Sequence, residues 1–497
     1  MIKKILRIVG ILVIMYLSLM VIFFFIRSTA DQPVRYSKKI KERIEQVESG
    51  LAGWVQTPAG DMKWSIEERM ASYKVPGVSI AVIDNYKIEW VKGYGWADVA
   101  EQRPVTTQTL FQAASVSKSL NAVGVLRLAQ DGKIDMNEDI SRYLTSWEFP
   151  YDSLTGGKKV TMLSLLSHTA GLTIHGFPGY AQGEQLPVIA DILDGNPPAN
   201  TSAVRSQFEP GVKSQYSGGG TTISQLVVED VTQQPYDEYM QRKVLGPIRM
   251  SGSSYSQPPS ADAQLLATAY SANGDEVPGK YHIYPEQAAA GLWTNPTDLA
   301  RYVIEMQLAY EGKPNRVLSR EMAYLMMIPV IENSFINPGA LAAPGVFIER
   351  IGGETYFQHS GSNRGFLCQY YGRLTDGKGV VVMTNSSSSG IIREIINSVA
   401  IAYDWDGFYI PVVKDTIAPA NLDAYVGKYV MSNGATYTIT KSNDKLFLEN
   451  RLPRQIYFAS QEDFFVTEAR GDYKFLFNDD GDVIGFALGD SIADKIE

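Results

Sequence analysis

A serine and a lysine three residues apart are the best candidates for chemistry in this chain. They belong to the motif Ser-Val-Ser-Lys at residues 115–118, which precedes a mostly apolar stretch that ends at an Asp-Gly pair. This pattern predicts a helix closed by glycine. Because residues three apart share one face of a helix, the Lys118 amine can approach the Ser115 hydroxyl. An amine buried among apolar groups loses its proton readily enough to activate a serine for attack on a carbonyl.

This four-residue motif alone is a weak signal. A second copy, Ser442-Asn443-Asp444-Lys445, falls in an expected hairpin turn, and we interpret it as a solvated turn without chemistry. For Ser115 the competing interpretation is a helix-capping serine followed by a surface lysine. Its helix looks too apolar for a surface helix, yet motif and helix together leave both interpretations open.

Two further segments support chemistry at Ser115. Tyr216 comes just before another helical pattern, and a phenol at such a corner between loop and helix could relay protons. Taken alone, it would be one packed tyrosine among the 28 in the chain. The segment His359-Ser360-Gly361-Ser362 follows an expected strand around Tyr356. Its small residues would let a substrate backbone lie along the strand, and a backbone N–H there could complete an oxyanion site. The competing interpretation of His359 is an ordinary histidine at a strand end.

In this order the three motifs resemble those of the serine β-lactamase and penicillin-binding superfamily, in its class C-like branch of carboxypeptidases, esterases and related hydrolases. The resemblance covers roughly residues 60 to 400 and implies an α+β (α/β sandwich) fold, in which helices flank an antiparallel sheet. Further matching stretches are Tyr73-Lys74-Val75-Pro76-Gly77-Val78, residues 165–172, Pro210-Gly211, Leu245-Gly246-Pro247 and Ala289-Ala290-Gly291-Leu292.

The resemblance also implies the roles of individual residues. Ser115 would be the acylated nucleophile, Lys118 its base partner and Tyr216 the group that passes a proton to the leaving group. The backbone amides of Ser115 and Ser362 would form the oxyanion hole, beside Gly361. His359 would contact the polar end of the substrate or the tyrosine. We expect His168, in a matching stretch, to support the fold beside the site.

Two departures from the family pattern bear on the substrate. Gly218 stands where many relatives carry an asparagine that orients the lysine and the substrate. His359 stands where many carry a lysine, so a fixed positive charge for a substrate carboxylate is weakened. Both changes lower the expectation of efficient β-lactam hydrolysis, favour cleavage of peptides, D-amino-acid amides or esters, and leave room for a degenerate site.

Composition excludes several other classes of function. The 497 residues include 45 Lys+Arg and 54 Asp+Glu, a formal charge of −9, which argues against a nucleic-acid partner. Cys368 is the sole cysteine, so an internal disulfide and cysteine-based metal sites are excluded; we expect it to be a small buried strand residue. The four histidines form no HExxH pair. We therefore expect no metal and no cofactor.

The chain divides into five expected segments. Residues 1–30 hold an uncharged apolar run, Ile8 to Ile26, preceded by Lys3, Lys4 and Arg7, which we interpret as a single-pass membrane anchor, with a cleaved signal peptide as the alternative. Residues 31–59 would be a solvated stalk, 60–405 the hydrolase domain, 406–420 a linker, and 421–497 a small antiparallel β-barrel-like domain, similar to an accessory domain often appended to such hydrolases.

The sequence therefore predicts an extracytoplasmic serine hydrolase at the cell membrane, or a secreted one if the first segment is cleaved. It would act through a Ser115 acyl-enzyme on small-molecule or peptide substrates, including those derived from peptidoglycan, in the manner of a D-alanyl carboxypeptidase or esterase, with weak β-lactamase activity as an option. The alternative is a catalytically degenerate penicillin-binding-like protein that serves as a ligand-binding or cell-wall-binding module.

Overall fold

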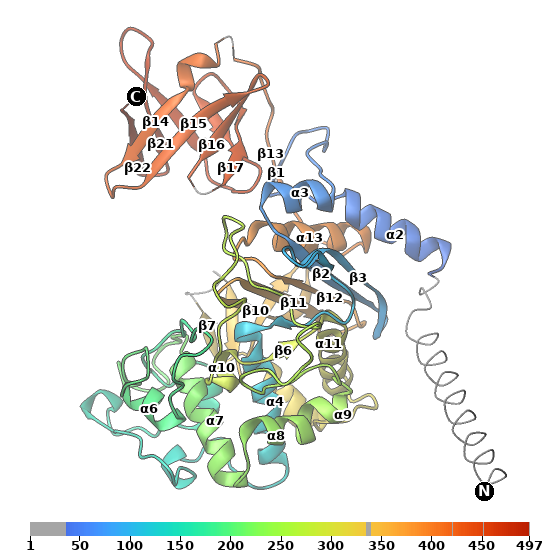
Figure 1. Ribbon diagram of the computed structural model, residues 1–497, viewed down its shortest axis with the longest axis vertical. Coiled ribbons are helices and arrows are strands. Elements are labelled where there is room, and N and C mark those ends of the chain that lie inside the picture. The colour runs from blue at the N-terminus through green and yellow to red at the C-terminus, as the bar shows by residue number, and fades with distance from the viewer. Residues whose placement is uncertain (1–35, 334–338, 420, 451, 497) are drawn as a thin grey trace, which may run out of the picture. The chain divides into compact units, whose positions relative to one another are not determined.

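The computed structural model describes residues 36–333, 339–419, 421–450 and 452–496 (Figure 1). Residues up to Ile44 form one unit and Glu45–Glu497 a second. The expected anchor, Ile8 to Ile26, lies outside the described residues and stays a prediction. Among the helices that are described, none is both long and apolar enough to cross a membrane.

The expected stalk is helical, but it is not solvated throughout. Helix α2 (Lys38–Ser49) carries the predicted Lys/Glu pairs, yet Val47 and Leu51 are fully buried. The carbonyl of Val47 also accepts a hydrogen bond from the Ser398 hydroxyl at 2.8 Å. The expectation was wrong for these two residues: Val47 lies on a buried face of α2, and Leu51, just beyond the end of the helix, pairs with Trp64.

A nine-stranded sheet within the described residues forms the centre of the hydrolase region. Its order is β4-β3-β2-β12-β11-β10-β9-β8-β7, and its neighbouring strands are antiparallel. The strands are β2 (Gly77–Asp84), β3 (Lys87–Asp98), β4 (Arg103–Pro104), β7 (Ile331–Asn333), β8 (Ala340–Ala343), β9 (Val346–Ile351), β10 (Glu354–Asn363), β11 (Phe366–Arg373) and β12 (Gly379–Thr384).

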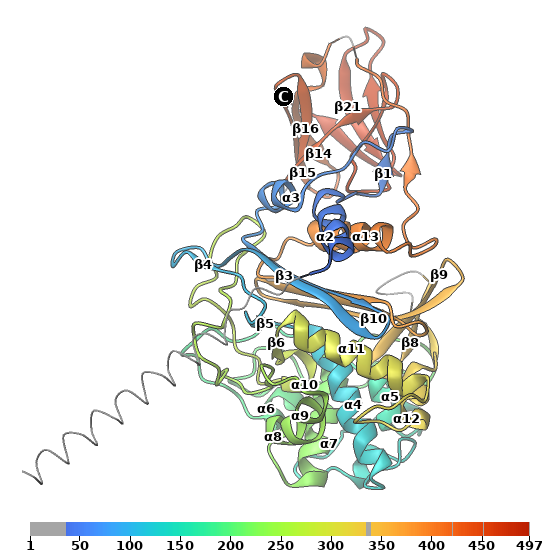
Figure 2. The ribbon, with the colours of Figure 1, turned by 90° about the vertical axis from the view of Figure 1, so that its right-hand side faces the viewer.

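Helices cover both faces of this sheet. Figure 2 shows α13 (Gly390–Ala402) on one side and α11 (Pro296–Tyr310) on the other. Strand β2 is buried along nearly its whole length, as expected for a strand covered on both faces. The predicted α/β sandwich is therefore confirmed. The remaining helices of the region are α3 (Ile66–Ser72), α4 (Ser117–Gln130), α5 (Met162–Leu166), α6 (Ile189–Asp194), α7 (Gly218–Thr232), α8 (Tyr236–Met240), α9 (Gly246–Ile248), α10 (Gln287–Ala290) and α12 (Arg320–Met327).

Helix α4 runs through the interior rather than over the surface. Its first turns are buried on every side, from Ser117 to Leu126. It ends before Asp131, where Gly132 adopts a left-handed conformation with φ of +68°, so the predicted glycine stop is confirmed. Burial of these first turns places Lys118 in an apolar environment.

Residues 421–496 form a second antiparallel sheet, and the predicted barrel-like domain is confirmed. Its order is β17-β16-β15-β14-β22-β21-β20-β19-β18. Only Ile456 separates the two end strands, and its N–H donates to Leu446 O on β16 at 2.8 Å, so the sheet almost closes. The strands are β14 (Gly427–Met431), β15 (Thr436–Ser442), β16 (Lys445–Glu449), β17 (Pro453–Gln455), β18 (Tyr457–Phe458), β19 (Asp463–Phe465), β20 (Tyr473–Phe477), β21 (Val483–Leu488) and β22 (Ser491–Lys495).

The second Ser-x-x-Lys copy lies in a tight turn of this barrel. Ser442 ends β15, Lys445 begins β16, and the two residues between them have positive φ values of 46° and 55°. All four residues are exposed. This confirms the interpretation of the second copy as a solvated hairpin turn.

The expected stalk and linker differ from plain connectors because they pair with each other. Strand β1 (Val55–Gln56), from the first, lies parallel to β13 (Val412–Val413), from the second. Phe408 is also buried, with its ring 5.2 Å from that of Tyr356. Parallel pairing of segments more than 350 residues apart leaves no local signature in the sequence.

A buried ion cluster anchors helix α13, which reaches the cavity described below. Arg69 of α3, 4% exposed, contacts Glu394 of α13 and lies 3.0 Å from Glu468 of the barrel. The Tyr73 hydroxyl donates to Glu394 at 2.6 Å. Charges so far from water are stable only when paired in this way, so the cluster fixes α13 against its neighbours.

Candidate active site

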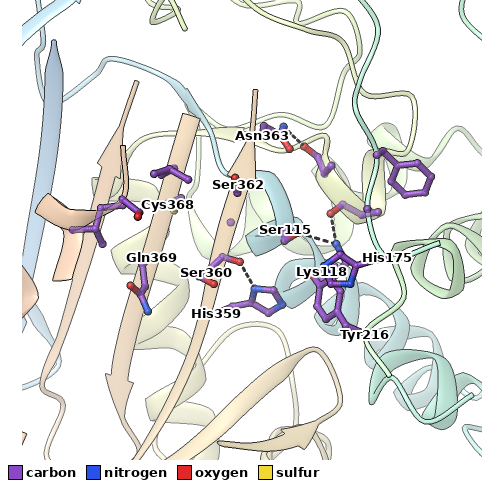
Figure 3. Close-up of a pocket in the computed structure, with 18 residues that line it drawn as sticks. Ser115, Lys118, His175, Tyr216, His359, Ser360, Ser362, Asn363, Cys368 and Gln369 are labelled. Atoms are coloured by element: carbon purple, nitrogen blue, oxygen red, sulfur yellow. Dashed lines mark hydrogen bonds between the residues drawn. The ribbon is translucent and has the colours of Figure 1, made fainter. Parts of the chain in front are cut away.

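The six residues predicted for the site line a single cavity of 460 Å³. Ser115 lies in the short 3-10 turn before α4 and Lys118 in the first turn of α4. Tyr216 comes from the loop before α7, and His359, Gly361 and Ser362 from strand β10. Figure 3 shows them converging from these three elements. The other lining residues are His175, Gly176, Phe177, Ala289, Ala290, Ser360, Asn363, Leu367, Cys368, Gln369, Ser389 and Ile392.

A sharp turn places Ser115 at the head of α4. Ala114 has a positive φ of 49°, which is unusual for a residue with a side chain and typical of functional turns. Ser117 stabilises this turn, since its hydroxyl donates to Ala114 O at 2.5 Å and accepts from Leu292 N–H at 3.0 Å. The sequence alone gave Ser117 no role.

Lys118 is held against Ser115 by two hydrogen bonds. Its amine lies 3.1 Å from Ser115 Oγ and donates to the carbonyl of Ala289 at 2.6 Å. Burial lowers the pKa of Lys118 to about 7, because the charged amine is poorly solvated there. A substantial fraction of Lys118 is therefore neutral near pH 7 and able to accept a proton.

Tyr216 is suited to donate a proton rather than to accept one. Burial raises its pKa above the ordinary value, although a hydrogen bond with Ser115 opposes that shift. The phenol therefore stays protonated where Lys118 is partly neutral. The Lys118 amine also lies 5.0 Å from the centre of the tyrosine ring. These two groups divide the proton chemistry, with the amine as base and the phenol as donor.

His168 holds the chain on both sides of Tyr216, in line with its expected supporting role. Its carbonyl accepts from Gln215 N–H at 2.8 Å, and its ring Nδ1 accepts from Ser217 N–H at 3.2 Å. Its ring also lies 4.3 Å from the Tyr216 ring, centre to centre. Burial holds the pKa of His168 well below the ordinary value, so Nδ1 remains free to accept.

Gly218 leaves no room for the asparagine of the family pattern. A β-carbon at this position would lie 2.9 Å from Phe177 Cε2 and 3.1 Å from His175 O. The loop carrying these residues thus fills the space of the missing amide. Lys118 has its acceptor in Ala289 O, which does not depend on residue 218.

The last residues of strand β10 pair on one side only, and Gly361 among them packs against the turn that carries Ser115. It pairs with β11 from Tyr356 to Asn363 but with β9 only as far as Gln358. A β-carbon on Gly361 would lie 2.1 Å from Ala113 O and 3.0 Å from Ser115 N. Only glycine therefore lets the strand approach the turn that carries Ser115.

His359 is a buried, neutral histidine. Its Nδ1 lies 2.7 Å from the carbonyl of Ser360, which can only accept, so Nδ1 carries the proton. Burial, assisted by the charge of Lys118, lowers the pKa of His359 to about 3. The residue therefore supplies no positive charge near neutral pH. The departure from lysine noted in the sequence thus changes the electrostatics of the site.

Several residues of the site carried no signal in the sequence. Asn363 extends β10 beyond the predicted motif, and its amide donates to Gln112 Oε1 at 2.8 Å and Ala290 O at 3.1 Å. Ser389 and Ile392 reach the cavity from the N-terminal end of α13. Cys368 lies buried in β11 as expected, and burial raises the pKa of its thiol.

Within the described ranges, no group of three or more His, Cys, Asp or Glu side chains could hold a metal ion.

Comparison with known proteins agrees with this geometry. The family model described as Beta-lactamase matches residues 65–396, more than half of the chain. The chain belongs to the β-lactamase family. The resemblance deduced from its motifs is thereby confirmed at the level of the superfamily. A second model, described as a domain of unknown function, matches residues 412–495 of this β-lactamase-family chain.

Individual relatives are distant. Penicillin-binding protein 4* of Bacillus subtilis is 21% identical over 415 residues, covering 78% of this chain and 87% of the relative. Protein flp of Staphylococcus aureus (strain MRSA252) is 27% identical over 197 residues, so the match spans 39% of this chain and 37% of that protein.

Solved structures share the fold of this β-lactamase-family chain. The octameric penicillin-binding protein homologue from Pyrococcus abyssi superposes with a TM-score of 0.61 at 22% identity, covering 86% of this chain and 98% of that one. A D-amino acid amidase from Ochrobactrum anthropi superposes with a TM-score of 0.58 at 19% identity, covering 74% and 99% respectively.

The lowered pKa of Lys118 gives acylation a specific pH dependence. Because the neutral amine is the base, the rate of acyl-enzyme formation should fall about tenfold per pH unit below about 7 and level off above it. Replacing the amine, in Lys118→Ala, should slow acylation at least about 100-fold. Stopped-flow acylation by an activated ester from pH 5 to 9 measures both effects.

Glu286 provides the matched control for this pH profile. Its carboxyl is fully buried just before α10, and burial raises its pKa to about 8, in the same range. Glu286→Gln should therefore keep the inflection near pH 7. Loss of the inflection in Glu286→Gln would assign it to the carboxyl and contradict Lys118 as the base.

Because β10 approaches Ser115 so closely, any side chain at position 361 should lower the reactivity of the serine. In Gly361→Ala the added methyl would collide with the backbone at residue 113, so the strand must move away from the serine. The rate of covalent labelling by a fluorophosphonate should fall about 100-fold, as when an oxyanion donor is lost.

Gly176→Ala is the control, since a β-carbon at Gly176, which lines the same cavity, meets no atom within 4 Å. Labelling of this variant should stay within a few-fold of the wild-type rate. Thermal unfolding of both variants separates a local displacement from loss of the fold. Equal labelling of the two alanine variants would contradict the steric argument.

Proposed function

We propose that this chain is a serine hydrolase that cleaves peptides, amides or esters through an acyl-enzyme on Ser115. The observation that carries the proposal is the pair of hydrogen bonds that hold a buried Lys118 amine against Ser115 Oγ. A serine hydroxyl is a weak nucleophile without an adjacent base. An amine with a pKa of about 7 supplies that base at neutral pH.

The acylation half-reaction follows from this arrangement. Neutral Lys118 takes the proton of Ser115 as Oγ attacks the substrate carbonyl, and a tetrahedral oxyanion forms. The N–H groups of Ser115 and Ser362 would stabilise that oxyanion. When the carbon–leaving group bond breaks, Tyr216 protonates the leaving group and regains a proton from Lys118. The product is an ester between Ser115 and the acyl group.

Deacylation reverses the same proton path. A water molecule attacks the ester carbonyl and gives its proton to neutral Lys118, directly or through Tyr216. The tetrahedral intermediate then collapses, the bond to Ser115 Oγ breaks, and the oxygen recovers the proton. The enzyme returns to its starting state, and a carboxylic acid is released. Every proton is carried by groups of the chain or by water.

The names of the relatives suggest the substrate class. A penicillin-binding protein homologue and a D-amino acid amidase both share this fold; the first is named for penicillin and the second for D-amino-acid amides. We therefore propose D-alanyl peptides, D-amino-acid amides and small esters as substrates, in the manner of the class C-like branch. Efficient β-lactam hydrolysis is disfavoured, because His359 is neutral and the orienting asparagine is replaced by Gly218.

Mass spectrometry of the intact protein tests this proposal. Incubation with a fluorophosphonate, a penicillin, p-nitrophenyl esters and D-Ala-D-Ala peptides should yield a covalent adduct on Ser115 with at least one of them. Ser115→Ala should abolish the adduct and the hydrolysis. Ser442→Ala, which alters the serine of the second Ser-x-x-Lys copy, should change neither. Absence of any Ser115 adduct or turnover would favour a non-catalytic binding module instead.

We also propose that the hydrolase domain lies outside the cytoplasm, held by the apolar segment Ile8 to Ile26. The uncharged length of this segment and the basic residues before it support the proposal. In intact cells the full chain should fractionate with membranes and be cut by external protease. A chain lacking residues 1–30 should be neither membrane-bound nor exported. A full chain that stays protected inside the cell would contradict this location.

A further inference from the structure

One polar atom in the cavity has no partner on the protein. His359 is 2% exposed and lines the cavity, and its Nε2 makes no hydrogen bond to any described residue. Its Nδ1 is committed to Ser360 O at 2.7 Å, so Nε2 bears a lone pair and can only accept. Leaving such a buried acceptor unpaired costs free energy. This nitrogen is therefore suited to accept a hydrogen bond from a bound ligand.

His359 and Gly361 lie on the same face of β10, because residues two apart on a strand point the same way. The β-carbon direction of Gly361 leads to the turn that carries Ser115. The imidazole of His359 therefore faces the reacting groups, and its ring lies 6.2 Å from that of Tyr216, centre to centre. Figure 3 shows this ring beside Tyr216 and Lys118. A substrate group bound at Nε2 would thus lie close to the scissile bond, on the side of Tyr216.

We propose that His359 is a specificity-determining residue that accepts a hydrogen bond from an uncharged N–H group of the substrate, and so selects amide-terminated over carboxylate-terminated substrates. This inference rests on the proposed function and names the substrate class of the same site. A terminal carboxamide offers N–H donors to Nε2. A carboxylate offers only acceptors, which would face the lone pair and lose their hydration.

The charges around the cavity support the same selection. Among the described lining residues, Lys118 is the sole lysine or arginine. Its amine already makes hydrogen bonds with Ser115 Oγ and Ala289 O. Burial also lowers the pKa of His175, so this histidine adds no fixed positive charge either. Arg364, just after β10, is exposed and does not line the cavity. A carboxylate entering this cavity would therefore be desolvated without a compensating cation.

His359 is a recognition group rather than a second base. A proton acceptor works best when its pKa is near the working pH, and the pKa of this imidazole is about 3. Hydrogen bonding to a donor does not require proton transfer. Lys118 remains the base, and His359 affects the reaction by binding an N–H group of the substrate.

A matched pair of substrates tests this selection. N-acetyl-D-alanyl-D-alanine amide and N-acetyl-D-alanyl-D-alanine share the scissile bond and differ only in the terminal group. We expect kcat/KM to be at least about tenfold higher for the amide, the effect of one hydrogen bond gained against one acceptor left unpaired. Phenyl acetate, which carries neither group, reports acylation itself. If phenyl acetate is not turned over and Ser115 forms no adduct, the proposed function fails, and not merely its specificity.

Variants at His359 should move the amide-to-carboxylate ratio. His359→Phe keeps a ring but removes the acceptor, so the ratio should fall several-fold toward 1. His359→Lys introduces a donor, so the ratio should invert. Because each ratio is taken within one variant, a smaller folded fraction affects both substrates equally and cancels.

Arg364→Ala is the matched control, and its ratio should equal that of the wild type. A wild-type ratio at or below 1 would overturn the proposal, as would an unchanged ratio in His359→Phe. A carboxylate preference that disappears in Arg364→Ala would also overturn it and assign recognition to the arginine. Failure of both peptides to be cleaved or to compete with phenyl acetate would equally overturn it.

Discussion

The burial of Lys118 is the constraint on which the rest of the site depends. Helix α4 passes through the interior of the hydrolase region, so the amine at its first turn has little access to water. This environment lowers the pKa of Lys118 to about 7, and the amine lies 3.1 Å from Ser115 Oγ. The other parts of the site serve this arrangement. Ala289 O fixes the amine, Ser117 stabilises the turn beneath the serine, and His168 holds Tyr216 beside both.

The two departures from the family pattern have different consequences. At Gly218 the loop with His175 and Phe177 fills the space beside the glycine, and Lys118 still has a hydrogen-bond acceptor in Ala289 O. At His359 nothing restores the missing charge, since the imidazole is neutral and its outer nitrogen is unpaired. The first departure preserves the base of the reaction. The second alters what the cavity can recognise.

The fold brings these parts together from positions far apart in the chain. Strand β10 stops pairing with β9 after Gln358, and its Gly361 then packs against the turn that carries Ser115, more than 240 residues earlier. Helix α13 adds Ser389 and Ile392 to the cavity wall while its Glu394 is bound by Arg69, which also contacts Glu468 of the barrel. One wall of the cavity is thus connected, through a single helix, to the contact with the C-terminal domain.

Structural features that depend on local spacing can be predicted from the sequence. The Ser115–Lys118 pair, the glycine stop of α4 and the turn at Ser442 all follow from patterns within a few residues. Other features depend on the tertiary structure. They are the acceptor for Lys118, which lies 171 residues away, the burial of Val47, the pairing of β1 with β13 and the neutral state of His359. These properties arise from contacts with and burial by segments distant in the sequence, and short-range sequence patterns contain no record of which segments will pack together.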